Sequence, residues 1–367
     1  MISTSCRWGI LGTATISRKN WQAILDSGNS RLVAVASRDR AKSVQFVAEC
    51  QSAVPHPSPP LALGSYEALI THPEVDAVYI PLPTGVRKDW VIRAAQAGKH
   101  VLVEKPVGCT VADVSEMIAV CEKYGVQFMD GVMFMHTERL KKMRAVLDDA
   151  SSVGRIRRIT TQFSFHADEE FISGNIRTHR ALEPQGCLGD LGWYCIRFSL
   201  WAMGWRMPRR VTGRILAEAG QPAADGAVPL EFSGELLFDG GASAGFFCSF
   251  VAENQQWGVV SGDKGFLRVP DFVLPFKGGH TRYSVTNSDF QLDGCQFDMI
   301  EGRRELETAE PSSNAPRSQE ANLFHRFSEI VLSKKLDPHW PKIALQTQTV
   351  MDACLESARD GSAAREI

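Results

Sequence analysis

Residues 188–197, LGDLGWYCIR, place Asp190 and Tyr194 four residues apart among glycines and apolar side chains. On a helix this spacing puts a carboxylate and a phenol on the same face. A phenol can exchange a proton with a substrate oxygen at neutral pH if a nearby cation lowers its pKa from the usual value of about 10. The same residues also fit a core helix that happens to contain a tyrosine.

A candidate for that cation is Lys105, in KHVLVEKP at residues 99–106. The apolar run before it predicts a buried parallel strand, and α/β proteins bind ligands at the carboxyl edge of such strands. Pro106 restricts the backbone, so we expect Glu104 and Lys105 to project differently. A surface lysine in a strand-to-helix loop is the alternative interpretation.

WGILGTATIS, residues 8–17, resembles a dinucleotide-binding turn. The strand pattern ends at Gly12 and a helix begins within a few residues, a geometry in which backbone N–H groups bind a pyrophosphate. The usual fingerprint is GxGxxG, and here alanine and serine take the second and third positions. Expected cofactor contacts in this segment are Gly12, Thr13, Ala14 and Ile16.

VAVASRDR, residues 33–40, ends the next predicted strand and bears on the choice of cofactor. An acidic residue at this point would bind the ribose 2′-OH of NAD(H), whereas the chain has Ser37 and Arg38. A hydroxyl and a guanidinium suit a 2′-phosphate, which favours NADP(H) over NAD(H). Asp39 leaves two alternatives open, because it can bind the ribose or pair with Arg38.

The elements that must position these residues alternate in the first third of the chain. Apolar runs and helical stretches follow one another up to about residue 133, which predicts βαβ units and a parallel sheet. We therefore expect an α/β nucleotide-binding domain over residues 1–133.

The pattern changes over residues 134–367, where Gly- and Asp-rich turns separate β-rich stretches and predict a large, mainly antiparallel open sheet in an α+β domain. One closing helix, over about residues 341–360, can pack back on the first domain. An apolar stretch, GASAGFFCSF at 241–250, suits either packing against a symmetry mate or a helix-covered face.

Composition excludes several classes of function. The formal net charge of −2 gives no basic surface for nucleic acid or anionic membrane, and no apolar run approaches the roughly 20 residues of a membrane span. Nine scattered cysteines without a CxxC pair, and no secretory signal, predict reduced thiols in a cytoplasmic protein. His166 and His179 belong to no clear set of metal ligands, so we expect no metal site.

Taken in order, GILGTATIS, ASR, PLPT, GKHVLVEKP and LGDLGWY resemble the glucose–fructose oxidoreductase / inositol dehydrogenase / MocA-like (Gfo/Idh/MocA) family over nearly the whole chain. The EKP segment is the most specific mark. The branch that looks most similar contains dimeric dihydrodiol dehydrogenases and NADP-dependent D-xylose dehydrogenases. The resemblance implies a Rossmann domain, a substrate and oligomerisation domain, and a homodimer or homotetramer formed through the C-terminal sheet.

The resemblance also implies roles for individual residues. Lys105 and Tyr194 would share proton transfer, and Asp190 would orient the substrate or Lys105. Further cofactor contacts would come from the PLPT and EKP segments, namely Leu82, Pro83, Thr84, Glu104, Lys105 and Pro106. Arg87 stands where the family often has a histidine, which leaves its contact with cofactor or substrate in doubt. Candidate substrate-side residues are His136, Arg177 and Trp193, and a structural role is the alternative for each.

The expected activity is an NADP-dependent dehydrogenase or reductase that moves a hydride to or from a hydroxyl-bearing or carbonyl carbon of a sugar, polyol or diol. Two alternatives are a non-catalytic NADP(H)-binding regulator and a sugar–sugar oxidoreductase with tightly bound NADP. Retention of both Lys105 and Tyr194 favours an enzyme.

Overall fold

The computed structural model describes residues 5–220 and 226–367, which form two compact units. The first unit contains Met1–His136, Ala181–Pro184 and Ser313–Gln348, and the second contains Thr137–Arg180, Gln185–Ser312 and Thr349–Ile367. This division differs from a single boundary after residue 133, because two later stretches of chain belong to the first unit.

The first unit is built on six parallel strands in the order β3-β2-β1-β4-β5-β6. The strands are β1 (Cys6–Leu11), β2 (Ser30–Ala36), β3 (Leu61–Leu63), β4 (Ala77–Ile80), β5 (His100–Val103) and β6 (Phe128–Asp130). The helices between them are α1 (Thr15–Asp26), α2 (Arg40–Ala53), α3 (Tyr66–Ile70), α4 (Thr84–Gln96) and α5 (Val111–Lys123). The strand order reverses between β1 and β4, and ligands bind beyond the carboxyl ends of strands at such a reversal. The predicted parallel α/β architecture is confirmed.

A late helix, α9 (Gln319–Ser333), completes the core of the first unit. Trp8 of β1 is fully buried, and its ring lies 4.9 Å from that of Phe324 and 5.0 Å from that of Phe327. Its indole Nε1 donates a hydrogen bond of 3.1 Å to Ser328 Oγ. The sequence pattern predicts one closing helix, and α9 is a second, unpredicted helix in this part of the chain.

The second unit is built on nine strands in the order β14-β13-β12-β11-β7-β10-β9-β8-β15. They are β7 (Ile156–His166), β8 (Arg210–Ala219), β9 (Val228–Leu237), β10 (Ser243–Ser249), β11 (Val251–Gly262), β12 (Phe266–Val269), β13 (His280–Asp293), β14 (Gln296–Ala309) and β15 (Arg365–Glu366). β10 and β7 pair in parallel, and the other neighbours pair antiparallel. The expected mainly antiparallel sheet is therefore confirmed.

Helices cover one face of this second sheet. α8 (Trp193–Ala202) packs on β7 and β10, and the unit also contains α6 (Glu138–Asp149), α7 (Glu169–Gly174) and the end of α10 (His339–Arg359). Ala244, Phe246 and Cys248 of β10 are all buried, and the Cys248 Sγ lies beside the turn that leads into α8. The apolar residues of GASAGFFCSF thus fit the helix-covered alternative, and an oligomer formed through this sheet stays a prediction.

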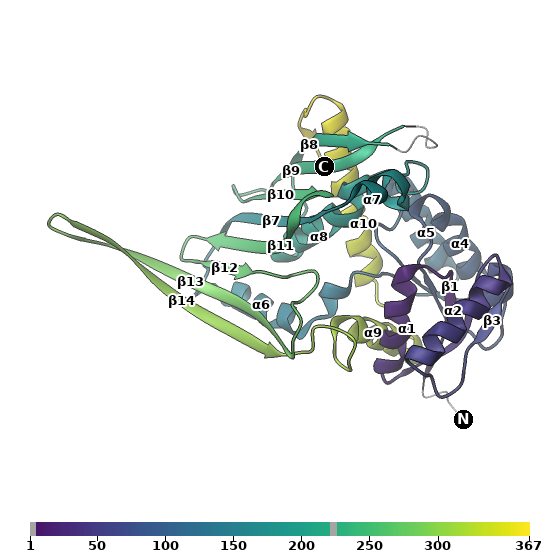
Figure 1. Cartoon of the computed structure of the whole chain (residues 1–367). Coiled ribbons are helices and arrows are strands. Elements are labelled where there is room, and N and C mark those ends of the chain that lie inside the picture. The colour runs from purple at the N-terminus through teal and green to yellow at the C-terminus, as the bar shows by residue number, and fades with distance from the viewer. Residues whose placement is uncertain (1–4, 221–225) are drawn as a thin grey trace. The chain divides into compact units, whose positions relative to one another are not determined.

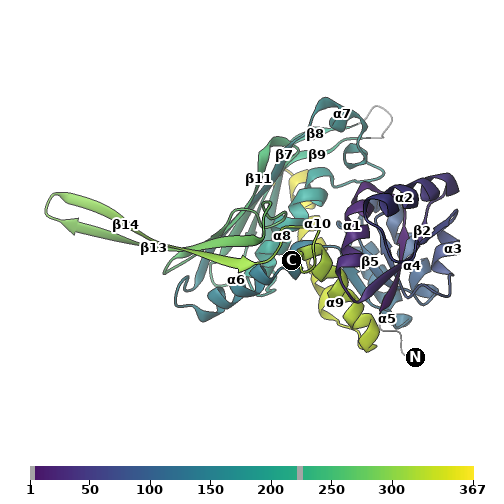
Figure 2. The ribbon, with the colours of Figure 1, turned by 60° about the horizontal axis from the view of Figure 1, so that its bottom comes forward.

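The hairpin of β13 and β14 extends as an arm beyond the other strands of its sheet (Figures 1 and 2). The two strands stay in register from His280 opposite Ala309 to Asp293 opposite Gln296. Residues 288–305 of this arm are all exposed.

Three further properties concern the described ranges 5–220 and 226–367. Within them, no helix is long and apolar enough to cross a membrane. The same residues contain no cluster of three or more His, Cys, Asp or Glu arranged to hold a metal ion. All nine cysteines lie in these ranges, and none of them forms a disulfide bond.

Candidate active site

Gly12, at the turn between β1 and α1, provides room that another residue would fill. Its φ is +121°, and a Cβ atom there would lie 3.1 Å from Leu82 Cδ2 and 3.8 Å from the Tyr66 hydroxyl. The helix begins after Ala14, whose methyl side chain offers no acceptor to the first N–H groups of α1. A pyrophosphate suits this turn, because it accepts from helix N-terminal N–H groups and needs close backbone approach.

Two residues after β2 have different roles: Asp39 caps α2, and Arg38 places a cation near Tyr66. Asp39 Oδ1 accepts a 2.9 Å hydrogen bond from Ala41 N and caps α2, while the buried Ser37 Oγ accepts from Asp39 N at 3.3 Å. Burial raises the pKa of the Tyr66 hydroxyl, and the neighbouring Arg38 guanidinium offsets part of that rise. Since Tyr66 also lies beside Gly12, the structure brings the two predicted cofactor segments together.

Arg87 of α4 holds two loops together. Its Nε donates to Leu82 O at 2.9 Å, and its Nη1 donates to Glu104 O at 2.7 Å and also to Pro106 O. The residue is only 3% exposed, and burial lowers the pKa of its guanidinium. Contrary to the expectation of a cofactor or substrate contact, Arg87 is a positioning residue that ties the PLPT loop to the EKP loop.

The start of α4 is held by a carboxylate that no sequence motif predicts. Glu183 accepts from Thr84 N at 3.1 Å and from Thr84 Oγ1 at 2.6 Å. Gly85 N donates to Leu182 O at 2.9 Å, and a Cβ at Gly85 would collide with Ala181 O. Residues 181–184 therefore fix the PLPT loop, although no local pattern links them to it in the sequence.

The EKP segment follows β5 and separates its two ionisable residues. Glu104 is 8% exposed, with Oε1 accepting from the Tyr79 hydroxyl at 2.5 Å and Oε2 accepting from Lys105 N at 3.2 Å. Burial and the Glu104 carboxylate raise the pKa of Tyr79. Lys105 is partly exposed at the carboxyl edge of the sheet, and the Lys105–Pro106 peptide bond is cis. Tyr79 could have been noticed as the polar group in an otherwise apolar strand.

His136 is a packing residue of the first unit, contrary to its expected place on the substrate side. Its ring is 7% exposed and stacks on Trp340 at a centroid distance of 4.6 Å. The backbone oxygen of His136 also accepts from Asn322 Nδ2 at 3.1 Å.

In the second unit, a π-helical turn over Leu188–Gly192 leads into α8. Such turns are rare in proteins, and those that occur often lie at functional sites. A Cβ at Gly192 would lie 2.8 Å from Leu188 Cδ1 and 3.2 Å from Cys248 Sγ, so a larger residue there would have to displace the Leu188 side chain. This turn contains Asp190, and Tyr194 follows it in the first turn of α8.

Arg177, a predicted substrate-side residue, meets the predicted catalytic residue Asp190 at this turn. Arg177 Nε lies 2.9 Å from Asp190 Oδ2, with Asp190 mostly covered and Arg177 partly exposed. Tyr194 is partly exposed, and its ring meets Phe163 of β7 edge-on at 5.6 Å. The second unit thus groups a carboxylate, a guanidinium and a phenol near the start of α8.

Trp193, also expected to contact substrate, is fully buried. The guanidinium of Arg197, likewise fully buried, lies 5.7 Å from its ring centroid. Trp193 is therefore a core residue of α8. A shared proton-transfer role for Lys105 and Tyr194 stays a prediction.

Comparisons with known proteins agree with these features. Residues 6–132 match the Gfo/Idh/MocA oxidoreductase family with its NAD-binding Rossmann fold, and residues 140–268 match the Gfo/Idh/MocA C-terminal domain. The chain is 31% identical over 361 residues to D-xylose 1-dehydrogenase (NADP(+)) 2 of Haloferax volcanii. The aligned residues cover 97% of this chain and 98% of that protein.

Two further relatives come from a mammal and a bacterium. Trans-1,2-dihydrobenzene-1,2-diol dehydrogenase of Bos taurus is 30% identical over 306 residues, or 81% of this chain and 84% of that protein. The aldose-aldose oxidoreductase structure from Caulobacter crescentus has a TM-score of 0.80 and 25% identity, covering 99% of this chain and 100% of that one. With matching domains in both halves and a relative at 31% identity over almost its full length, the chain belongs to the Gfo/Idh/MocA oxidoreductase family.

Proposed function

We propose that this protein is an NADP-dependent oxidoreductase that transfers a hydride to or from a carbon of a sugar, cyclic polyol or dihydrodiol. The observation that carries the cofactor choice is the arrangement after β2. Asp39 caps α2, while Arg38 lies beside Tyr66 at the turn that contains Gly12. A guanidinium favours a 2′-phosphate, and the carboxylate that would favour NAD(H) is already engaged. The NADP(+) in the name of the Haloferax volcanii relative supports the same choice.

The substrate class follows from the relatives together with the polar groups of the second unit. The three relatives are named for D-xylose, a dihydrobenzene diol and aldoses, all of which carry neighbouring hydroxyl groups. Asp190 and Arg177 can accept from and donate to such hydroxyls, respectively. We assign them to holding the substrate.

Bound NADP(H) would accept or supply the hydride, and the chain's residues would manage the proton. In oxidation Tyr194 accepts the proton of the reacting hydroxyl, and in reduction it donates a proton to the carbonyl oxygen. The ammonium of Lys105 stabilises the phenolate form, since a nearby cation favours the charged state of an acid. Arg87, Glu104 and Glu183 position the loops around Lys105 and Thr84.

The test pairs wild-type protein with Tyr194→Phe. Both are titrated with NADPH and NADH by fluorescence, and oxidation is screened across pentoses, hexoses, inositols and dihydrodiols. We expect NADPH to bind more tightly than NADH to both proteins, and one substrate class to be turned over only with Tyr194. Tighter binding of NADH would contradict the cofactor assignment, and full activity of Tyr194→Phe would contradict the proton assignment.

The likeness to the aldose-aldose oxidoreductase supports a second candidate, in which tightly bound NADP(H) couples oxidation of one sugar to reduction of another. Purified protein would then carry nucleotide, and it would convert a mixture of an aldose donor and acceptor without added cofactor. Nucleotide-free protein that depends on added NADP+ would exclude this candidate. A regulator without catalysis is disfavoured because both Lys105 and Tyr194 are present.

A further inference from the structure

The arm formed by β13 and β14 ends in an exposed apolar surface, the tip patch, formed by Phe290, Leu292, Phe297 and Met299. Phe290 lies opposite Met299 and Leu292 opposite Phe297, so the four side chains share one face of the hairpin. Their exposed fractions are 57%, 60%, 67% and 67%. Large apolar side chains clustered in this way mark an interaction site.

The remainder of the arm around the tip patch is acidic. Residues 283–302 contain Asp289, Asp293, Asp298 and Glu301 but no lysine or arginine. By strand alternation the three aspartates belong to the opposite face, and Asp293 flanks the turn. A pocket that encloses the end of the hairpin must therefore offer apolar surface to one face and positive charge to the other.

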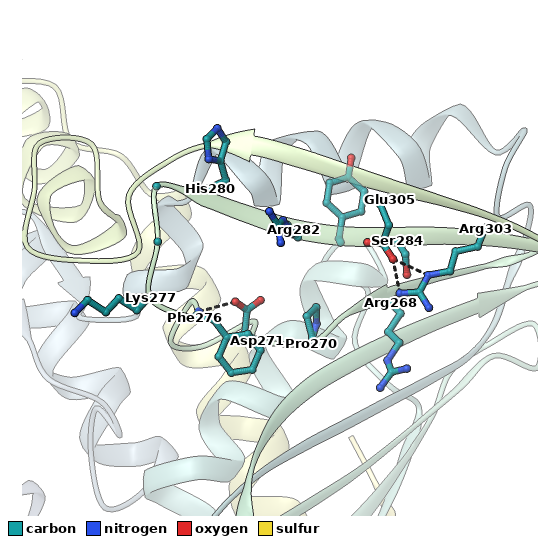
Figure 3. Close-up of a pocket in the computed structure, with 13 residues that line it drawn as sticks. Arg268, Pro270, Asp271, Phe276, Lys277, His280, Arg282, Ser284, Arg303 and Glu305 are labelled. Atoms are coloured by element: carbon teal, nitrogen blue, oxygen red, sulfur yellow. Dashed lines mark hydrogen bonds and ion pairs between the residues drawn. The ribbon is translucent and has the colours of Figure 1, made fainter.

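Such a surface exists at the base of the same arm, in a pocket of about 500 Å³ (Figure 3). We call it the base pocket. It combines apolar and cationic side chains from β12, β13, β14 and the loop between β12 and β13, chiefly Arg268, Pro270, Phe276, Lys277, Arg282 and Arg303. Phe276 is 63% exposed, so the pocket has apolar surface open to a ligand.

The acidic residues of the base pocket already have partners. Asp271 pairs with the buried Arg139 and accepts from Phe276 N at 2.7 Å, and Glu305 accepts from Arg303 Nε at 2.6 Å. The pocket wall also contains Arg268 and Lys277, with no further acidic residue among its lining residues in the described ranges. Arg282 Nε lies 2.6 Å from Glu307 Oε1, and Arg303 pairs with Glu305, so the charge that complements the acidic tip comes from Arg268 and Lys277.

An arm cannot fill its own base pocket. Leu292 and Arg282 are separated by ten residues of a continuously paired strand, and at about 3.3 Å per residue this is a distance of roughly 30 Å. The occupant must come from another molecule, and a second copy carries the matching tip. Reciprocal docking around a two-fold axis would use both tips and both pockets, as closed dimers do.

We propose that the tip patch of each copy docks into the base pocket of a second copy, so that the chain forms an arm-exchanged homodimer. This contact is distinct from the apolar residues of β10, which face helices, and it does not depend on the proposed activity.

The first experiment uses the native thiol at the arm's turn. Cys295 is exposed, and Lys277 lines the base pocket. Full-length Lys277→Cys protein is treated with a short bis-maleimide and separated under denaturing conditions. We expect covalent dimers from Lys277→Cys and none when Cys295 is also changed to Ser. Lys123→Cys, exposed on α5, is the matched control. Equal yields from both single variants would overturn the proposal.

The second experiment measures mass by sedimentation equilibrium over a range of concentrations. The wild type should reach twice the 40.5 kDa of one chain. Phe297→Glu and Met299→Glu should each weaken dimerisation tenfold or more, with circular dichroism unchanged. Ile300→Glu is the control, because Ile300 is 48% exposed but lies opposite Asp289 on the other face. A monomeric wild type, or equal weakening by all three variants, would overturn the proposal.

Discussion

Arg177 Nε lies 2.9 Å from Asp190 Oδ2, which joins a short 3-10 turn over Ile176–Thr178 to the π-helical turn before Tyr194. The Asp190 side chain is 13% exposed and that of Arg177 is 41% exposed. An ion pair open to water on one side contributes little to folding, generally below about 1 kcal/mol. A functional role therefore predicts that its loss affects activity more than stability.

We expect Arg177→Ala to lower kcat/KM at least about tenfold, equivalent to about 1.4 kcal/mol of transition-state stabilisation. The free energy of unfolding should fall by less than about 1 kcal/mol. Arg177→Lys, which keeps the charge but not the guanidinium geometry, should be intermediate. Steady-state kinetics and urea unfolding of the three proteins check this, and parallel losses of activity and stability would indicate a structural pair instead.

Arg38 and Asp39 are adjacent but should respond differently to substitution. Arg38→Ala should weaken NADPH binding about tenfold to a hundredfold and leave NADH binding nearly unchanged, because only NADPH carries the 2′-phosphate. Asp39→Ala removes the cap of α2 and should cost about 1 kcal/mol of stability without changing the cofactor preference. Fluorescence titrations and thermal unfolding separate the two effects, and an unchanged NADPH affinity in Arg38→Ala would refute the assignment.

Gly12 and Gly28 both have a positive φ, so the effects of replacing them with alanine can be compared directly. Gly12→Ala would strain a φ of +121° and place a methyl group 3.1 Å from Leu82 Cδ2. Gly28 has a φ of +78°, and a Cβ there meets no described atom within 4 Å. Both variants should lose about 1 kcal/mol of stability from the backbone. Only Gly12→Ala should lose NADPH affinity, by tenfold or more in titration calorimetry, and similar affinities for both variants would argue against a phosphate at this turn.

Asp76 gives a pH-dependent test of the first sheet. It accepts from Arg7 N at 3.0 Å, Arg7 Nε at 2.9 Å and Arg7 Nη2 at 2.7 Å. Burial would raise the pKa of Asp76, but the bonds from Arg7 outweigh it and hold that pKa below its usual value. A lowered folded pKa stabilises the fold above the unfolded value of about 3.9, and this contribution disappears as the pH falls through the folded value.

Asp76→Asn should therefore cost about 1–2 kcal/mol at neutral pH, and its difference from wild type should shrink toward about pH 3. Urea unfolding at several pH values measures this difference. Glu74→Gln is the control, because the Glu74 side chain is 57% exposed and its Oε1 lies 3.7 Å from Arg7 Nη1, a longer and more exposed contact than that of Asp76. A difference from wild type that stays constant with pH would contradict the assigned charge interaction.

The sequence predicted the first sheet well, because buried parallel strands are apolar runs bounded by turns. It missed β3, which has only three residues and lies at the edge of the sheet. It also missed β14, whose sequence QFDMIEGRRELETA has no regular apolar alternation and which pairs with β13 along its full length. The signal for α9 was present, since Leu323, Phe324 and Phe327 follow helical spacing.

The positions of site residues could be predicted where they belong to a short local motif. They could not be predicted where burial or a partner distant in the sequence determines the role of the residue. Gly12 and Arg38 lie where the turn patterns placed them. The sequence predicts Trp193 and His136 on the substrate side because it does not show that each packs in a core. Glu183 reaches Thr84 across 99 positions, so no short pattern could reveal it.

The packing of Trp8 against α9 also bears on how the protein can be made. Trp8 belongs to the first strand, whereas Phe324, Phe327 and Ser328 follow more than 300 residues later. A ribosome exposes the strands of the Rossmann domain first, and N-terminal domains generally fold during synthesis. Here the nascent domain must keep an indole uncovered until α9 emerges. A fragment that ends with β6 would therefore present this apolar surface to water and to chaperones, even though it contains all six strands of the sheet.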